Sequence, residues 1–154
     1  MTPHGPAPGS TKVSGVRDVT GIDAEWLAEA MPFARAIGVE LVSAAAEEVR
    51  GRLEWAPERC TSGGVLHGGV LMAFADTAGA LCAILNLRPG EGTSTIESKT
   101  NFFRAVRSGA VEAVARPLHV GRTTVVVQTD LRDDQGRRVA QVTQTQAVLA
   151  PRRS

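Results

Sequence analysis

The sequence predicts an α+β fold in which an antiparallel sheet wraps around one long central helix. About 18 residues, 69–86, contain no proline and are apolar on every face, as expected for a buried helix. Two segments with strand patterns precede this helix, and four follow it with short turns between them. The chain has 154 residues and is 43% apolar, which is enough for one domain with a substantial core.

The N-terminal part of the chain reads as a tail followed by a short helix. The first 20 residues are rich in proline and glycine and show no periodic apolar pattern. A helix is expected from Ile22 to Met31, with Asp23 as its N-cap and Pro32 as its end. The expected organisation is a flexible tail (1–20), one domain (21–150) and a polar C-terminal tail (151–154).

The predicted strands are bounded by turn residues. Before the central helix, two strands at 36–43 and 46–55 are expected to form a hairpin, since apolar Val49, Leu53 and Trp55 alternate with charged residues. The four later strands are expected at 93–103, 110–120, 123–132 and 138–149. Their short turns favour an antiparallel meander.

The central helix carries a single acid. From Cys60 to Leu87 the only charged side chain is Asp76, near the middle of the helix. A charge in an apolar core costs several kcal/mol unless it is paired or used, so we expect Asp76 to take part in chemistry. The alternative is structural: Asp76 caps a backbone group or meets an arginine of a neighbouring strand.

A glycine-rich loop leads into this helix. His67, Gly68 and Gly69 lie where the helix begins, and glycines let a ligand approach the backbone closely. The first N–H groups of a helix are unpaired and carry the positive end of its dipole, so they can polarise a carbonyl. The alternative is that the glycines only form a turn.

The spacing of the two features points to a site shared between subunits. His67 and Asp76 are nine residues apart, or about 13 Å along a helix. One helix therefore cannot bring its own N-terminus and Asp76 to the same reacting atom. If both act on one substrate, a second copy of the chain is required.

The pattern Gly-x-x-His-Gly-Gly, separated by six residues from Asp76 within Ala-Asp-Thr-Ala-Gly, resembles the hotdog-fold thioesterases of the phenylacetate-degradation (PaaI-like) type. The run 95–104 is similar to the family's strand after the helix, and the resemblance covers about residues 35–150. It implies the hotdog arrangement of a sheet curled around one helix. It also implies hydrolysis of an acyl- or aroyl-CoA thioester, and a homotetramer built from two dimers.

The resemblance further implies roles for individual residues. The thioester carbonyl would lie against the Gly68 N–H, and Asp76 from the partner chain would act as general base on water or as nucleophile. His67 would orient the loop and contact the thioester region. Thr95 stands where relatives carry a small polar residue near the attacking water. Relatives have Asn or Gln six residues before the histidine, whereas this chain has Thr61, which has a shorter reach.

Coenzyme A, as part of the substrate, brings phosphates that need cations at the surface. Candidate cations are Lys99, Arg104, Arg107 and Arg122, and Arg122 is favoured by its position after Gly121. Further substrate-binding candidates are Gly69 and Thr77. Each cation also fits an ordinary solvated strand or turn. No separate cofactor is expected.

Composition argues against several classes of function. A formal net charge of +1 gives no general attraction to nucleic acid or to an acidic membrane. Cys82 is expected to be a core residue, and two cysteines are too few for a disulfide scaffold. Three scattered histidines lack the spacing of a metal site, and no Gly-x-Ser-x-Gly motif is present. Because the N-terminus lacks an apolar leader, we expect a cytoplasmic location.

Three alternative functions follow from the same residues. A protein of this fold that binds acyl-CoA without cleaving it is favoured by Thr61 and disfavoured by the presence of both the loop and Asp76. A hydratase would pair Asp76 with a histidine five residues later, where this chain has Leu81. A Cys60–His67 nucleophile pair lacks a third orienting group. The identity of the acyl group stays open.

Overall fold

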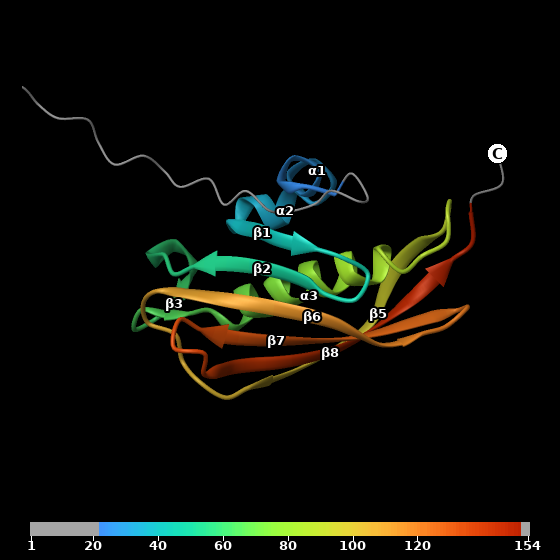
Figure 1. Ribbon diagram of the computed structural model, residues 1–154. Helices are drawn as coiled ribbons and strands as arrows, with labels where there is room; N and C mark the ends of the chain where they lie inside the picture. The colour runs from blue at the N-terminus through green and yellow to red at the C-terminus, as the bar shows by residue number, and fades with distance from the viewer. Residues whose placement is uncertain (1–21, 152–154) are drawn as a thin grey trace, which may run out of the picture.

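One long helix, α3 (Gly68–Ile84), packs against a six-stranded antiparallel sheet (Figure 1). The computed structural model describes residues 22–151. Strand order is β1-β2-β6-β7-β8-β5. The strands are β1 (Val39–Ala44), β2 (Val49–Glu54), β5 (Gly92–Phe102), β6 (Ala110–Val120), β7 (Thr124–Asp133) and β8 (Arg138–Leu149). The predicted α+β architecture is thus confirmed, while the predicted tail at 1–20 lies outside the described residues.

The N-terminal helix is shorter than predicted and is followed by a second one. Helix α1 spans Ala24–Ala30, and the Asp23 side chain caps it by accepting a hydrogen bond from the Trp26 N–H at 2.8 Å. Pro32 ends this helix and also begins α2 (Pro32–Ala36), because proline is well suited to the first helical position. The strand predicted to start at residue 36 is therefore wrong at its beginning, and β1 starts after α2.

The order of the late strands corrects the predicted meander. Strands β6, β7 and β8 do follow one another in the sheet, but β5 pairs with β8 and β6 pairs with β2. Turn residues indicate where the chain reverses and not which strand it then joins. Here the segment after β5 crosses to the far side of β7 and β8, which makes β5 an edge of the sheet.

The segment before α3 contains short ordered elements where a loop was expected. A 3₁₀ turn, η1 (Pro57–Arg59), is followed by a small hairpin whose strands, β3 (Cys60–Thr61) and β4 (Val65–Leu66), have two residues each. The Cys60 thiol donates to the carbonyl of Ala56 at 3.2 Å, and no hydrogen bond joins it to His67 within the described chain. The alternative of a Cys60–His67 pair therefore has no support in this geometry.

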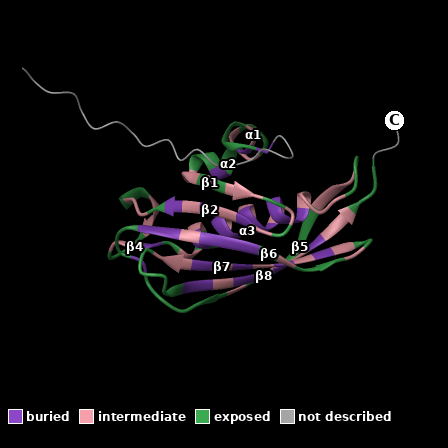
Figure 2. Ribbon diagram, viewed as in Figure 1, coloured by how far each residue is buried: buried purple, intermediate pink, exposed green. Residues whose placement is uncertain are grey.

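Only part of α3 is covered by its own sheet (Figure 2). Its covered face buries large side chains such as Phe74 and Leu81, and Gly51 on β2 admits the Phe74 ring, which lies 2.9 Å from where a Cβ would stand. The opposite face leaves a stripe half-buried or exposed. We call this the open stripe; it consists of Gly69, Met72, Ala73 and Asp76. The expectation that the helix is buried on every face is wrong for this stripe in the single chain.

The core is built from small and branched aliphatic residues. Cys82 is fully buried, as expected, and burial raises the pKa of its thiol to about 11. Within residues 22–151, no helix is long and apolar enough to cross a membrane.

Candidate active site

Asp76 lies on the open stripe beside β5 and β8. Its Oδ1 accepts a hydrogen bond from the Thr95 hydroxyl at 3.1 Å and another from Gln144 Nε2 at 3.0 Å. No arginine or lysine of the described chain forms an ion pair with it. The structural alternative, in which Asp76 pairs with an arginine of a neighbouring strand, is therefore wrong for the described chain. Within the same part of the chain, Oδ2 accepts no hydrogen bond.

The start of α3 is capped by the histidine of the motif. His67 is the N-cap residue, and its Nδ1 accepts a hydrogen bond from the Gly69 N–H at 2.8 Å. An accepting ring nitrogen carries no proton, so the proton of the neutral imidazole lies on Nε2. The N–H of the preceding residue, Gly68, has no partner among the described residues. His67 thereby holds one helix-end donor and leaves the neighbouring one free.

A groove of about 410 Å³ opens at Gly68. Thr61 and Arg104 line it together with the side chains of Phe102 and Phe103. The Phe102 ring lies over the helix start, since its Cζ would be 3.2 Å from a Cβ placed on Gly68. The structure therefore brings three predicted site residues, Thr61, Gly68 and Arg104, into one groove.

A separate hollow of about 270 Å³ surrounds Asp76. Thr95, Met72, Ala73 and Ser98 complete its lining. Eight residues of helix separate Asp76 from Gly68, which is about 12 Å at 1.5 Å per residue. Within one chain the predicted site is thus divided into a Gly68 groove and an Asp76 hollow, as the spacing in the sequence predicts.

The other predicted binding residues lie outside both cavities. The Thr77 hydroxyl donates to the Ala73 carbonyl one turn back. Lys99 follows Ser98 on β5, and because side chains alternate along a strand it faces away from the Asp76 hollow. Arg122 is exposed in the β6–β7 turn, which lies at the end of the sheet where β5 begins. The Gly68 groove lies at the opposite end, where β5 ends. About 30 Å of strand separates those two ends.

Two site residues were missed by sequence reasoning. Gln144 and Gln146 on β8 are each only 1% exposed, and both face α3. Burial on β8 alternates, with Val142 at the same parity as the two glutamines. The available signal was a polar residue at an inward position of β8, where the neighbouring inward position is aliphatic.

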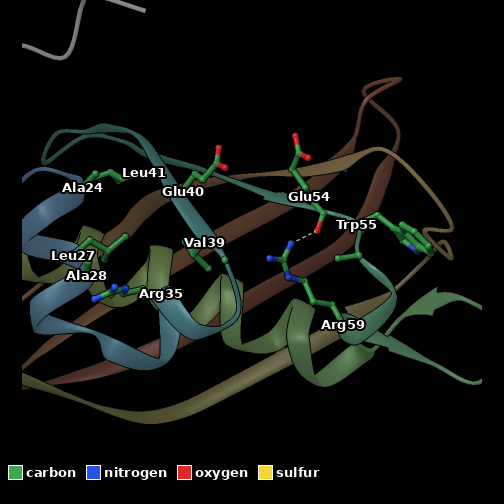
Figure 3. Close-up of a pocket in the computed structure, with 12 residues that line it drawn as sticks. Ala24, Leu27, Ala28, Arg35, Val39, Glu40, Leu41, Glu54, Trp55 and Arg59 are labelled. Atoms are coloured by element: carbon green, nitrogen blue, oxygen red, sulfur yellow. Dashed lines mark hydrogen bonds between the residues drawn. The ribbon is translucent and has the colours of Figure 1, made fainter. Parts of the chain in front are cut away.

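A larger cavity, of about 500 Å³, lies away from these residues (Figure 3). It is lined by α1, β1 and the end of β2, and Arg59 crosses it to donate to the Glu54 carbonyl at 2.7 Å. It contains no residue that the sequence predicted as part of the site. Size alone therefore does not identify the site in this molecule.

Comparison with known proteins places the chain in a family. Residues 63–140 match the sequence profile of the thioesterase superfamily. The proofreading thioesterase EntH of Cronobacter sakazakii is 36% identical over 86 residues, which cover 56% of this chain and 63% of EntH. The ComA2 protein of Bacillus subtilis, described as an esterase, is 33% identical over 116 residues, which cover 74% of this chain and 91% of ComA2.

Solved structures agree with the sequence matches. The crystal structure of thioesterase HI1161 from Haemophilus influenzae superposes with a TM-score of 0.79 at 28% identity, covering 85% of this chain and 93% of that one. This likeness confirms the expected hotdog fold. The alignments with three sequence relatives, EntH among them, span 54%, 63% and 55% of those proteins. The PaaI-like subtype stays a prediction. The profile match and the ComA2 alignment together establish that the chain belongs to the thioesterase superfamily.

Proposed function

We propose that the protein is an acyl-CoA thioesterase that hydrolyses an acyl- or aroyl-CoA thioester to the free acid and coenzyme A. The observation that carries this proposal is the state of the Asp76 carboxylate. Two donors hold its Oδ1, while Oδ2 accepts no hydrogen bond from the described chain, and the residue lines a hollow on the open stripe. Membership of the thioesterase superfamily supports the reaction type.

The proposed active unit is a dimer with shared sites. Strand β5 is an edge of the sheet with unpaired backbone groups, and Ile96 on it is 65% exposed. A two-fold axis across this edge would pair the two β5 strands antiparallel and set the two α3 helices side by side in opposite directions. Gly68 of each subunit would then approach Asp76 of the partner subunit. A tetramer of two such dimers follows only from the family resemblance.

The chemistry follows from the two halves of this shared site. The Gly68 N–H and the α3 dipole polarise the thioester carbonyl and stabilise the oxyanion that forms on it. In the first route, Asp76 Oδ2 takes a proton from water as the water oxygen attacks the carbonyl carbon. Collapse of the tetrahedral intermediate breaks the C–S bond and releases the CoA thiolate, which takes up a proton.

The second route starts with direct attack. Asp76 Oδ2 bonds to the carbonyl carbon, the C–S bond breaks, and a mixed anhydride forms that water then hydrolyses. Both routes use the same oxygen of the same carboxylate. Thr61 lines the Gly68 groove, where we expect it to hydrogen-bond the substrate or the water, and Thr95 donates to Asp76.

Arg104 is the preferred candidate for holding a phosphate of coenzyme A. It is the predicted cation that lines the Gly68 groove, together with Thr61. The Arg107 guanidinium is already engaged, because it donates to the Gly63 carbonyl at 2.7 Å. Lys99 and Arg122 stay candidates for a contact from another subunit.

The test is thiol release from a panel of acyl-CoAs. We expect Asp76→Asn to lower kcat by about 10²- to 10⁴-fold, the range for loss of a general base. The matched control is Asp130→Asn, an acid on the outer face bonded to Gln141, which should retain the wild-type rate. Tight acyl-CoA binding by the wild type without any turnover would refute the proposal and favour a binding protein, in which Thr61 replaces the catalytic amide.

A further inference from the structure

We propose that Gln144 and Gln146 are positioning residues that fix the Asp76 carboxylate with Oδ1 anchored and Oδ2 free to react. This inference rests on the proposed function, since it assigns the two glutamines a part in that reaction.

Gln144 contacts Asp76 from strand β8. Its Nε2 donates to Oδ1 at 3.0 Å and lies 3.5 Å from the Asp76 main-chain carbonyl oxygen. The amide fits between sheet and helix only because residue 79 is glycine. A Cβ there would stand 2.2 Å from Gln144 Oε1.

Gln146 acts on Asp76 through Thr95, its cross-strand neighbour on β5. Gln146 Nε2 donates to Thr95 Oγ1 at 2.8 Å, and the same Thr95 oxygen lies 3.1 Å from Asp76 Oδ1. An amide nitrogen can only donate, so the Thr95 oxygen accepts and its single hydrogen is directed at Asp76. At the other end, the Thr93 hydroxyl donates to Gln146 Oε1 at 3.0 Å. The chain of hydrogen bonds runs from the Thr93 hydroxyl through Gln146 and Thr95 to the Asp76 carboxylate, which only accepts.

A purely structural role does not explain these amides. Both are 1% exposed on a strand whose other inward positions, such as Val142, are aliphatic. Gln144 Oε1 is buried without a hydrogen-bond partner in the described chain. A buried polar atom without a partner is destabilising, and an aliphatic side chain of similar volume would avoid this. What the pair provides instead is one direct donor, from Gln144, and a second donor, the Thr95 hydroxyl, that Gln146 orients toward the same carboxylate oxygen.

The consequence for the reaction is orientation. Because both donors come from the sheet and meet at Oδ1, rotation of the carboxylate is restrained, and Oδ2 keeps no hydrogen bond within the described chain. In either route of the proposed reaction the attack or the proton transfer uses that oxygen. A displacement of about 1 Å at a reacting group lowers rates by up to about 10²-fold.

The test uses Gln144→Met and Gln146→Met, which retain side-chain length and remove the donor. We expect each to lower kcat by about 10- to 100-fold while KM changes less than about twofold, since the substrate contacts are untouched. Thr129→Val is the control, because Thr129 is a fully buried hydroxyl on β7 without a partner in the described chain. It should retain the wild-type kcat. Circular dichroism and melting temperature verify that each variant is folded.

Coupling separates positioning from packing. If Gln146 acts through Thr95, Gln146→Met should cause no further loss of kcat in a Thr95→Val background. Should a methionine variant fail to fold, Thr95→Val, at an exposed position of the same hydrogen-bond network, replaces it in the test. A lower kcat with an unchanged KM in this variant would support the positioning role. Folded variants with wild-type kcat, beside an inactive Asp76→Asn, would overturn the positioning role alone. Full activity of Asp76→Asn would overturn the proposed function and this inference with it.

Discussion

Gly79→Ala is the substitution that tests the packing between α3 and β8 most sharply. In most helices this change stabilises by about 1 kcal/mol. Here the new methyl group would stand 2.2 Å from Gln144 Oε1 and 2.5 Å from Cδ, so the amide must move by about 1 Å or more to reach ordinary contact. Overpacking costs about 1–3 kcal/mol. Loss of the hydrogen bond to the Asp76 carboxylate adds about 1.5–3 kcal/mol.

The net expectation for Gly79→Ala is a loss of about 2–4 kcal/mol in the free energy of unfolding, with a fall in kcat. Urea denaturation and thiol-release kinetics measure the two quantities on one preparation. In the double variant Gly79→Ala/Gln144→Val the clash is relieved, so stability should recover to within about 1 kcal/mol while kcat stays low. A Gly79→Ala protein that is as stable and as active as the wild type would refute the reasoning.

Three further predictions concern the core, the groove and the subunit contact. Burial raises the pKa of the Cys82 thiol to about 11, so between about pH 9 and pH 11 this thiol ionises in the unfolded chain but not in the folded one. The free energy of unfolding should therefore fall as the pH rises through this range, and Cys82→Ala should remove the fall. Denaturation at pH 8 and at pH 10.5 measures the difference. Phe102→Ala should change the preferred acyl chain more than it changes stability, since the half-exposed ring covers Gly68; kcat/KM across the acyl-CoA panel measures this. Ile96→Glu, at an exposed position of the β5 edge, should give an inactive monomer, whereas an active monomer in light scattering would contradict the shared site.

The features that sequence predicted well are those set by local chemistry. The glycine-rich start of the helix and the single acid at Asp76 are both set by residues close in the chain, whereas the capping of α3 by the His67 ring was not predicted. The separation of Gly68 from Asp76 follows from helix geometry alone. Local rules thus indicated both halves of the candidate site, whereas the family was expected from the resemblance of the motif and is shown by the profile match and the ComA2 alignment.

The features that sequence did not predict depend on distant partners. Pairing of β5 with β8 depends on how the whole sheet closes around α3, and turn residues carry no information about it. The Gln144 contact joins residues 68 positions apart, so no local pattern gives it. Pro32 was interpreted as a helix end when it is also a helix start, because the same fixed φ angle suits both sites.

The shared site is the central claim, and subunit mixing tests it most directly. Gly68→Pro removes the one free N–H at the first helical position, where proline is tolerated, and the preceding His67 already has compatible φ and ψ angles of −63° and 133°. Gly68→Pro and Asp76→Asn should each be inactive alone. When the two chains are refolded together, we expect recovery of about a quarter of the wild-type rate, because half of the dimers are mixed and each has one intact site. No recovery in a verified mixed dimer would contradict the claim that Gly68 and Asp76 act from different subunits.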